Sequence, residues 1–99
     1  MNPAITITRR DDGDTGRYEA RVEGRDGLGE LTYRRRSPEI VVADHTGVAD
    51  SLRGTGVAKA LVERLIADAR EEGFRIVPRC SFVLAQFERH PEWSDLLAA

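Results

Sequence analysis

The chain has 99 residues, of which 40% are hydrophobic and 32% are charged, and its formal net charge is −2. This length allows one hydrophobic core, so we expect a single domain over residues 1–99, and the composition is not that of a disordered or membrane protein. The charge disfavours nucleic acid as a partner. The sequence shows no signal-peptide pattern, and no apolar run approaches the length of a membrane span, which is about 20 residues. We therefore expect a cytoplasmic protein with no membrane partner.

Three half-buried strands are predicted in the first part of the chain. Apolar and polar residues alternate in segments 5–8, 18–23 and 29–34, which is the period of a strand with one buried face. Turn-forming residues separate these segments, so an antiparallel meander is the simplest topology. The last segment runs into Arg34-Arg35-Arg36, just before the turn signal Ser37-Pro38. The cluster has two interpretations. It is a solvated strand end, or one of its arginines lines the path of an acidic substrate or contacts the phosphates of a cofactor.

The rest of the chain predicts a strand, a helix, a strand and a second helix. Ile40 to Val48 begins with an apolar run that favours a central strand, and residues 58–70 follow a helical period that Gly73 ends. Residues 74–77 predict a fifth strand, parallel to the fourth, and Ser81 is a candidate cap for a helix that runs to about His90. The predicted fold is α+β: one mixed sheet in the order β-β-β-β-α-β-α.

A glycine-rich run, Arg53-Gly54-Thr55-Gly56-Val57-Ala58, joins the fourth strand to the first helix. Glycine lets the backbone approach an anion closely, and the first N–H groups of the helix point at that anion with the positive end of the helix dipole behind them. Lys59 stands where a dinucleotide fingerprint needs glycine or alanine, and a Walker A loop is also absent. The run predicts a diphosphate-binding loop; the alternative is an ordinary turn before a helix.

The single cysteine, Cys80, has two interpretations. It cannot form an internal disulfide, and with only His45 and His90 it makes no zinc-type spacing, so no metal site is expected. At the start of a helix the dipole favours its thiolate, which could accept an acyl group from a thioester. The alternative is a small buried hydrophobic residue.

His45 is the second titratable candidate. On strict alternation it shares a strand face with Val41 and Ala43, near the point where a parallel fifth strand delivers Cys80. An imidazole, whose ordinary pKa is about 6.5, could deprotonate an incoming amine or activate the cysteine there. The alternative is a structural histidine at a sheet edge.

Several motifs in order resemble those of the GNAT superfamily of N-acetyltransferases. The pattern Arg/Gln-x-x-Gly-x-Gly/Ala is filled by Arg53, Gly56 and Ala58, and the combination with His45-Thr46-x-Val48, Pro78-x-Cys80-Ser81-Phe82-Val83 and His90-Pro91-Glu92-Trp93 looks like the minimal, YjdJ-type branch. The resemblance implies that coenzyme A lies between the fourth and fifth strands. Its cofactor-binding residues would be Arg53, Gly54, Thr55, Gly56, Val57, Ala58, Val48 and Phe82.

The resemblance implies acetyl transfer from acetyl-CoA to an amine. In such a reaction the position and chemistry of the thiol make Cys80 a candidate carrier, and those of the imidazole make His45 a candidate base. Larger relatives often use a tyrosine in the second helix as the acid, and residues 81–90 contain none. A non-catalytic module that binds coenzyme A or an acyl-CoA, as a sensor or carrier, is therefore the alternative. The sequence leaves open whether the acceptor is a polyamine, another small amine, a peptide N-terminus or a lysine, and it leaves the oligomeric state open.

Overall fold

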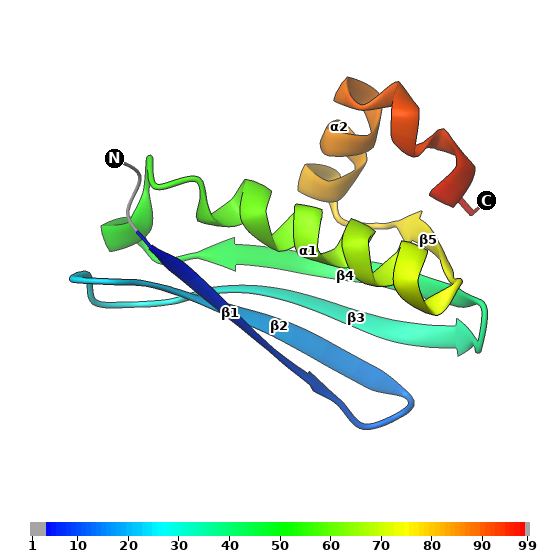
Figure 1. Cartoon of the computed structure of the whole chain (residues 1–99), viewed down its shortest axis with the longest axis horizontal. Coiled ribbons are helices and arrows are strands. Elements are labelled where there is room, and N and C mark those ends of the chain that lie inside the picture. The colour runs from blue at the N-terminus through cyan, green and yellow to red at the C-terminus, as the bar shows by residue number, and fades with distance from the viewer. Residues whose placement is uncertain (1–3, 99) are drawn as a thin grey trace.

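The computed structural model describes residues 4–98, which form one mixed sheet with its helices on one side (Figure 1). The predicted α+β fold and its order of elements are confirmed. The strands are β1 (Ile5–Asp11), β2 (Thr15–Val22), β3 (Gly29–Ser37), β4 (Ile40–Val48) and β5 (Arg75–Pro78). The helices are η1 (Asp50–Leu52), α1 (Val57–Glu72), α2 (Ser81–Arg89) and η2 (Pro91–Leu96), of which η1 and η2 are 3-10 helices.

The sheet has the strand order β1-β2-β3-β4-β5. The first four strands form the predicted antiparallel meander, and β4 pairs with β5 in parallel, as predicted. The apolar run of β4 lies inside the sheet, where Val41, Val42 and Ala43 have no exposed surface. The parallel pairing is short and ends at Ala43 and Pro78. Beyond that pair the two strands separate, and among residues 4–98 no strand pairs with the second half of β4 on that edge.

The helix α1 packs its apolar side on the sheet because its buried residues recur at helical spacing, from Val57 to Ala69. Gly73 ends the helix at φ +78°, where its N–H donates to the carbonyl of Ala69 at 2.9 Å. The helix α2 lies on the same side of the sheet as α1 (Figure 1). We call this side the helix face and the opposite side the outer face. No helix within residues 4–98 combines the length and the apolar character that a bilayer crossing requires.

Charged side chains fasten the edge strand β1 to the last turns of α1. The guanidinium of Arg9 pairs with Glu72 and with Asp68, the latter at 3.3 Å. The buried Tyr18 donates its hydroxyl to the same Asp68 at 2.7 Å. Burial, and next the bond to Asp68, raise the pKa of Tyr18. The tyrosine is therefore a hydrogen-bond donor at every ordinary pH.

Asp11 is the acceptor at the end of this network. Partial burial would raise its pKa, but hydrogen bonds from the Tyr33 hydroxyl, the Gly13 N–H and the Arg35 guanidinium lower the pKa of Asp11 to about 2. Arg35 therefore belongs to the network that joins β1 to β3. Of the three arginines in the predicted basic cluster, Arg35 forms an ion pair on the helix face, with Asp11.

The end of the chain lies beside β5. The N–H of Ala98 donates to the carbonyl of Ile76 at 2.7 Å, and η2 contributes the buried Trp93 to the core. The indole of Trp93 meets the ring of Phe87 edge to face and stacks on His90. The C-terminal segment thus covers β5, the strand that precedes Cys80.

Candidate functional site

The glycine run forms a turn that η1 and α1 hold from both ends. The side chain of Leu52 anchors it in the core with 1% of its surface exposed. Gly54 and Gly56 then adopt φ of +76° and +84°, a region that L side chains rarely enter, so glycine is needed at both positions. Gly56 is the N-cap of α1. The hydroxyl of Thr55 donates to the carbonyl of Leu52 and closes the turn from within.

The turn leaves backbone donors free for an anion. Among residues 4–98 we find no acceptor for the N–H groups of Gly54, Gly56 and the first three helical residues, 57–59. The first turn of α1 carries no acidic side chain that would compete for these groups. A Cβ placed on Gly54 or Gly56 would meet nothing within 4 Å, so the space beside the turn is open. The turn therefore fits a diphosphate, which brings charge to the positive end of the helix.

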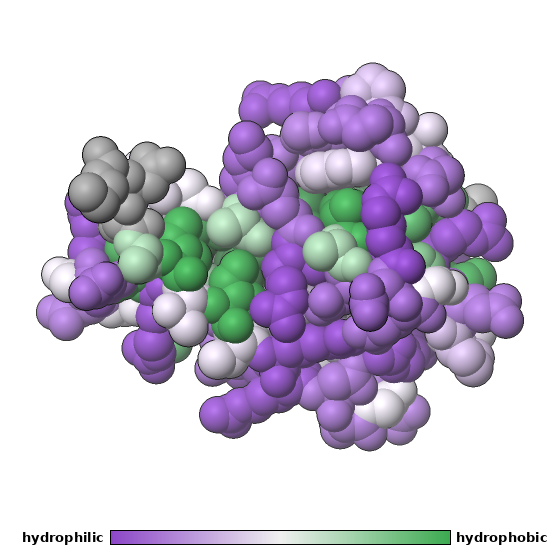
Figure 2. All heavy atoms as spheres, viewed as in Figure 1, coloured by the Kyte–Doolittle hydropathy of each residue, from purple (hydrophilic) through white to green (hydrophobic). Residues whose placement is uncertain are grey.

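A cavity of about 340 Å³ lies beside this turn on the helix face. Figure 2 shows the surface hollowed between the part formed by α2 and the end that carries η1, with hydrophobic side chains at the base. Seven of the eight predicted cofactor-binding residues line it: Val48, Arg53, Gly54, Gly56, Val57, Ala58 and Phe82. The remaining lining residues are Leu52 and Lys59. The sequence analysis did not identify Leu52. A single leucine among polar residues just before the glycines could have indicated a side chain that anchors the turn in the core.

The side chains of Thr55 and Arg53 differ in orientation from the other predicted cofactor-binding residues. The side chain of Thr55 turns inward to the Leu52 carbonyl and does not line the cavity. The guanidinium of Arg53 is 82% exposed and lies 3.3 Å from the carboxylate of Asp50. Such an exposed pair contributes little to stability, so this guanidinium can turn toward a ligand at small cost.

Cys80 lies just after β5 and is the N-cap of α2, the role that sequence analysis assigned to Ser81. That assignment was wrong because Ser81 already has helical geometry as the first residue of α2. The N–H of Cys80 donates to the carbonyl of Ala43 at 2.9 Å, and its sulfur lies 3.4 Å from Oγ1 of Thr46. The cysteine is therefore tied to β4 at the point where β4 and β5 separate.

The surroundings of the Cys80 sulfur favour its thiolate. The residue is 8% exposed, and burial alone would raise the pKa of the thiol. Hydrogen bonds from the Thr46 hydroxyl and from the N–H groups of Val83 and Phe82 act in the opposite direction, and the pKa of Cys80 falls below its ordinary value. Phe82, whose N–H takes part, also lines the cavity beside the glycine turn.

His45 does not lie where strict alternation placed it. The register shifts by one residue at Asp44, so Tyr33 faces Ala43 while Thr32 faces His45. This bulge turns the exposed imidazole to the outer face, where a Cβ on Gly47 would lie 3.0 Å from its Nε2. Thr46, the next residue, points to the helix face and to Cys80. The prediction that His45 shares a face with Val41 and Ala43 was wrong, and the sheet separates the imidazole from the thiol.

The described residues place no metal centre beside this site. Within residues 4–98, no three His, Cys, Asp or Glu side chains group in a way that could hold a metal ion. The chemistry available at the fork of β4 and β5 is that of a thiol with a lowered pKa, backbone donors and, on the other face, an imidazole.

Comparison with known proteins agrees with this geometry. Residues 17–96 match a family model described as GCN5-related N-acetyl-transferase. A solution structure of a GCN5-like putative N-acetyltransferase from Staphylococcus aureus is similar, with a TM-score of 0.72 and 29% identity over 95% of this chain and 88% of that one. No curated protein matches.

Two further structures support the fold at lower identity. A ribosomal-protein-alanine N-acetyltransferase from Brucella melitensis has a TM-score of 0.66 and 21% identity over 97% of this chain and 93% of that one. A GNAT family acetyltransferase from Elizabethkingia anophelis with acetyl-CoA bound has a TM-score of 0.63 and 14% identity over 90% of this chain and 74% of that one.

Proposed function

This protein belongs to the GCN5-related N-acetyltransferase family, and on that premise we propose that it transfers an acetyl group from acetyl-CoA to an amine. The observation that carries the proposal is the glycine turn with unpaired N–H groups beside a cavity on the helix face. A family member of similar fold binds acetyl-CoA.

The diphosphate of acetyl-CoA would rest on the N–H groups of Gly54, Gly56 and residues 57–59, at the positive end of α1. The guanidinium of Arg53 would turn from Asp50 toward the phosphates. The part of acetyl-CoA that joins the diphosphate to the thioester is a flexible arm. Val48 and Phe82 would form apolar walls along this arm. The arm would then lead to the fork of β4 and β5, where Cys80 lies.

We assign the role of acetyl carrier to Cys80. Its thiolate attacks the thioester carbonyl carbon, the bond from that carbon to the coenzyme A sulfur breaks, and coenzyme A leaves as a thiolate that takes a proton from solvent. The acceptor amine then attacks the acetyl carbon on Cys80. The carbon–sulfur bond breaks, the cysteine returns to its thiolate, and the amide product loses the proton of the amine.

His45 would receive that proton. It lies on the outer face, so it cannot activate Cys80 directly, but an amine that enters the fork from the outer face would pass it. An imidazole is suited to accept a proton from an attacking amine. The role that remains for His45 is therefore that of base toward the acceptor.

One structural feature supports our proposal that the chain belongs to the minimal, YjdJ-type branch of the family. Between residues 4 and 48 the described chain contains strands and turns and no helix. The acceptor must then be held by the sheet itself or by another molecule.

A non-catalytic module that binds coenzyme A or an acyl-CoA is the second candidate function. Two observations favour it: α2 contains no tyrosine, and Cys80 is only 8% exposed. In that case the thiol would be acetylated slowly or not at all, and no amine would remove the acetyl group.

Intact-mass spectrometry separates these functions. The wild-type protein is mixed with acetyl-CoA, freed of excess reagent, and then given a panel of primary amines. We expect a rapid gain of one acetyl group that maps to Cys80 and is absent in Cys80→Ser, followed by its loss when an amine is added. An acetyl group that persists in Cys80→Ser would remove this cysteine as the carrier. Absence of both an adduct and acetylated amine would leave only the binding module.

A further inference from the structure

Lys59 is the single lysine of the chain among 15 lysine and arginine residues. It lies in the first turn of α1, is exposed to solvent, and lines the cavity beside the glycine turn. Glu63 stands four residues later, at helical spacing for an ion pair, yet the ammonium of Lys59 forms no ion pair with any of residues 4–98. The ammonium is therefore free to meet a ligand.

The place of Lys59 in α1 brings its side chain toward the glycine turn. The Cα–Cβ bonds of an α-helix tilt toward the N-terminus of the helix, so a long side chain covers the turn before its own residue. For Lys59 the preceding turn is the glycine run, in which Gly56 is the N-cap of α1. Its ammonium is therefore within reach of an anion held at this end of the helix.

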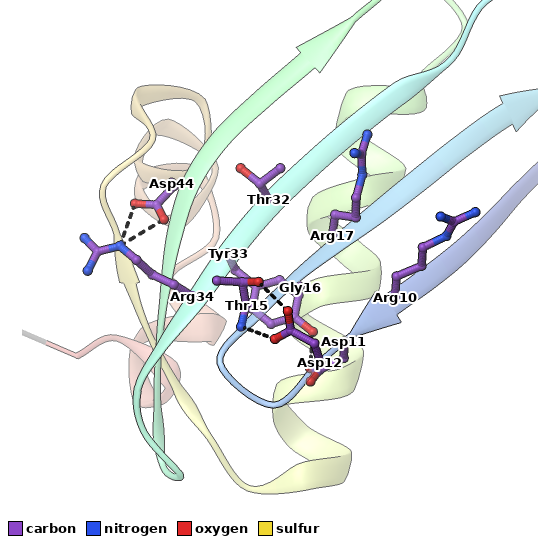
Figure 3. Close-up of a pocket in the computed structure, with 10 residues that line it drawn as sticks. All are labelled: Arg10, Asp11, Asp12, Thr15, Gly16, Arg17, Thr32, Tyr33, Arg34 and Asp44. Atoms are coloured by element: carbon purple, nitrogen blue, oxygen red, sulfur yellow. Dashed lines mark hydrogen bonds and ion pairs between the residues drawn. The ribbon is translucent and has the colours of Figure 1, made fainter.

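The charges around this cavity are unbalanced. Its charged lining residues are the cations Arg53 and Lys59, and the carboxylate that pairs with one of them is that of the exposed Asp50, 3.3 Å from Arg53. The larger cavity at the outer face, of about 490 Å³, is lined by three arginines and three aspartates, of which Arg34 and Asp44 form an ion pair (Figure 3). Of these two cavities, the one beside the glycine turn carries the excess of positive charge.

Coenzyme A carries more negative charge than its diphosphate. Its ribose bears a phosphate monoester at the 3′ carbon, a group with a charge of about −1.5 to −2 near pH 7. In the proposed function, the free N–H groups of the glycine turn and the guanidinium of Arg53 bind the diphosphate. The 3′-phosphate is attached to the same ribose as the diphosphate, so it stays near the turn while the arm leads away to the fork of β4 and β5. Lys59 is the lining cation that remains for it.

We propose that Lys59 binds the 3′-phosphate and that the protein thereby selects coenzyme A over 3′-dephospho-coenzyme A. The inference rests on the proposed function, because it takes the occupant of the cavity to be acetyl-CoA. It adds a residue that determines which form of the coenzyme is bound. Lysine suits this role because its ammonium is a compact charge with three donors, whereas a phosphate monoester presents three acceptor oxygens.

The test is a calorimetric titration of the full chain with coenzyme A and with 3′-dephospho-coenzyme A, which differ by that phosphate alone. We expect the wild type to bind coenzyme A at least about tenfold more tightly, because the smaller ligand lacks a charge-assisted contact. Lys59→Gln should raise the dissociation constant of coenzyme A by about tenfold and leave that of 3′-dephospho-coenzyme A unchanged. Glutamine is a good helix former, so this exposed helical position tolerates the change.

Two further variants separate a contact from a general effect of charge. Arg21→Gln removes one positive charge from an exposed position of β2 outside the cavity, and it should change neither dissociation constant. Lys59→Arg keeps the positive charge and should keep the preference for coenzyme A. Equal binding of the two ligands by the wild type, equal weakening of both by Lys59→Gln, or the same effect in Arg21→Gln would overturn the proposal.

The single lysine also allows a direct observation of the contact. Reductive methylation with ¹³C-formaldehyde labels amines and keeps their charge, so in this chain it labels Lys59 and the N-terminal amine. The methyl resonance of Lys59, identified by its absence in Lys59→Arg, should shift with coenzyme A and much less with 3′-dephospho-coenzyme A. Shifts of equal size with both ligands, or none with either, would contradict the contact.

The calorimetric titrations also separate this inference from the proposed function. If both ligands bind with equal affinity, the glycine turn remains the donor site and the role of Lys59 fails. If neither ligand binds, the proposed function fails and this inference fails with it.

Discussion

The sulfur of Cys80 lies 3.4 Å from the hydroxyl oxygen of Thr46, the residue that directly follows His45 in β4. Because consecutive residues of a strand point to opposite faces, the thiol contact lies on the helix face and the imidazole on the outer face. A single dipeptide thus connects the two sides of the sheet at the fork of β4 and β5. We infer that donor and acceptor approach this fork from opposite faces.

Thr46→Val should make the thiol of Cys80 less acidic. The Thr46 hydroxyl is one of the groups that lower the pKa of Cys80, so its removal raises that pKa. The rate of alkylation by iodoacetamide, measured against pH, should shift to higher pH in this variant. Thr8→Val, at an exposed position of β1, is the control and should leave the profile unchanged. An identical profile in Thr46→Val would show that this contact does not tune the thiol.

Gly56→Asp should abolish acetyl-CoA binding without unfolding the protein. The substitution places a carboxylate where the diphosphate would lie and strains a residue at φ +84°. Gly73→Asp imposes a comparable strain at φ +78° at the other end of α1 and is the matched control. Calorimetric titration should detect acetyl-CoA binding to Gly73→Asp and none to Gly56→Asp. Equal binding by the two variants would contradict the assignment of the turn.

His45→Ala should slow the second half of the reaction and leave the first intact. The imidazole lies on the outer face, so acetylation of Cys80 by acetyl-CoA should proceed at the wild-type rate. Discharge of the acetyl group to an amine should slow by on the order of 100-fold near neutral pH, a typical contribution of a general base. Quench-flow mass spectrometry measures both steps. A slower first step with an unchanged second step would reverse the assigned order of roles.

Asp11→Asn should destabilise the fold near neutral pH but not in strong acid. The pKa of Asp11 in the folded protein is about 2, below its ordinary value of 3.8, so ionised Asp11 stabilises the fold above about pH 4. This contribution is lost as the pH falls from about 4 to about 2. Urea unfolding should show a gap between wild type and variant at pH 7 that closes in this range, whereas Asp14→Asn should show little gap. A gap that persists at pH 2 would contradict the network described for β1.

Local pattern was sufficient for most of the fold. Alternation gave the first three strands because each has one buried face, and the helical period with Gly73 at its end gave α1. The glycine turn could also be predicted, since positive φ at Gly54 and Gly56 is a property of the residues themselves. Seven of the eight residues predicted to bind the cofactor line one cavity, and two of them, Val48 and Phe82, lie outside the turn and were assigned from the family resemblance.

Features that depend on pairing between distant segments could not be predicted. The bulge at Asp44 is set by the register of β4 against β3, and no local signal marks it, so strict alternation assigned His45 to the wrong face. Ser81 was a reasonable cap from composition, yet the hydrogen bond from Cys80 to Ala43 sets where α2 begins.

Thermal unfolding with and without acetyl-CoA tests the central claim most directly, with ATP as a control of similar charge. A ligand at one hundred times its dissociation constant stabilises the folded state by about 2.7 kcal/mol. In a domain of 99 residues this should raise the midpoint by on the order of 10 °C. We expect that increase with acetyl-CoA and not with ATP. An unchanged midpoint with saturating acetyl-CoA would contradict the assignment of the glycine turn as the acetyl-CoA site and, with it, the proposed acetyl transfer.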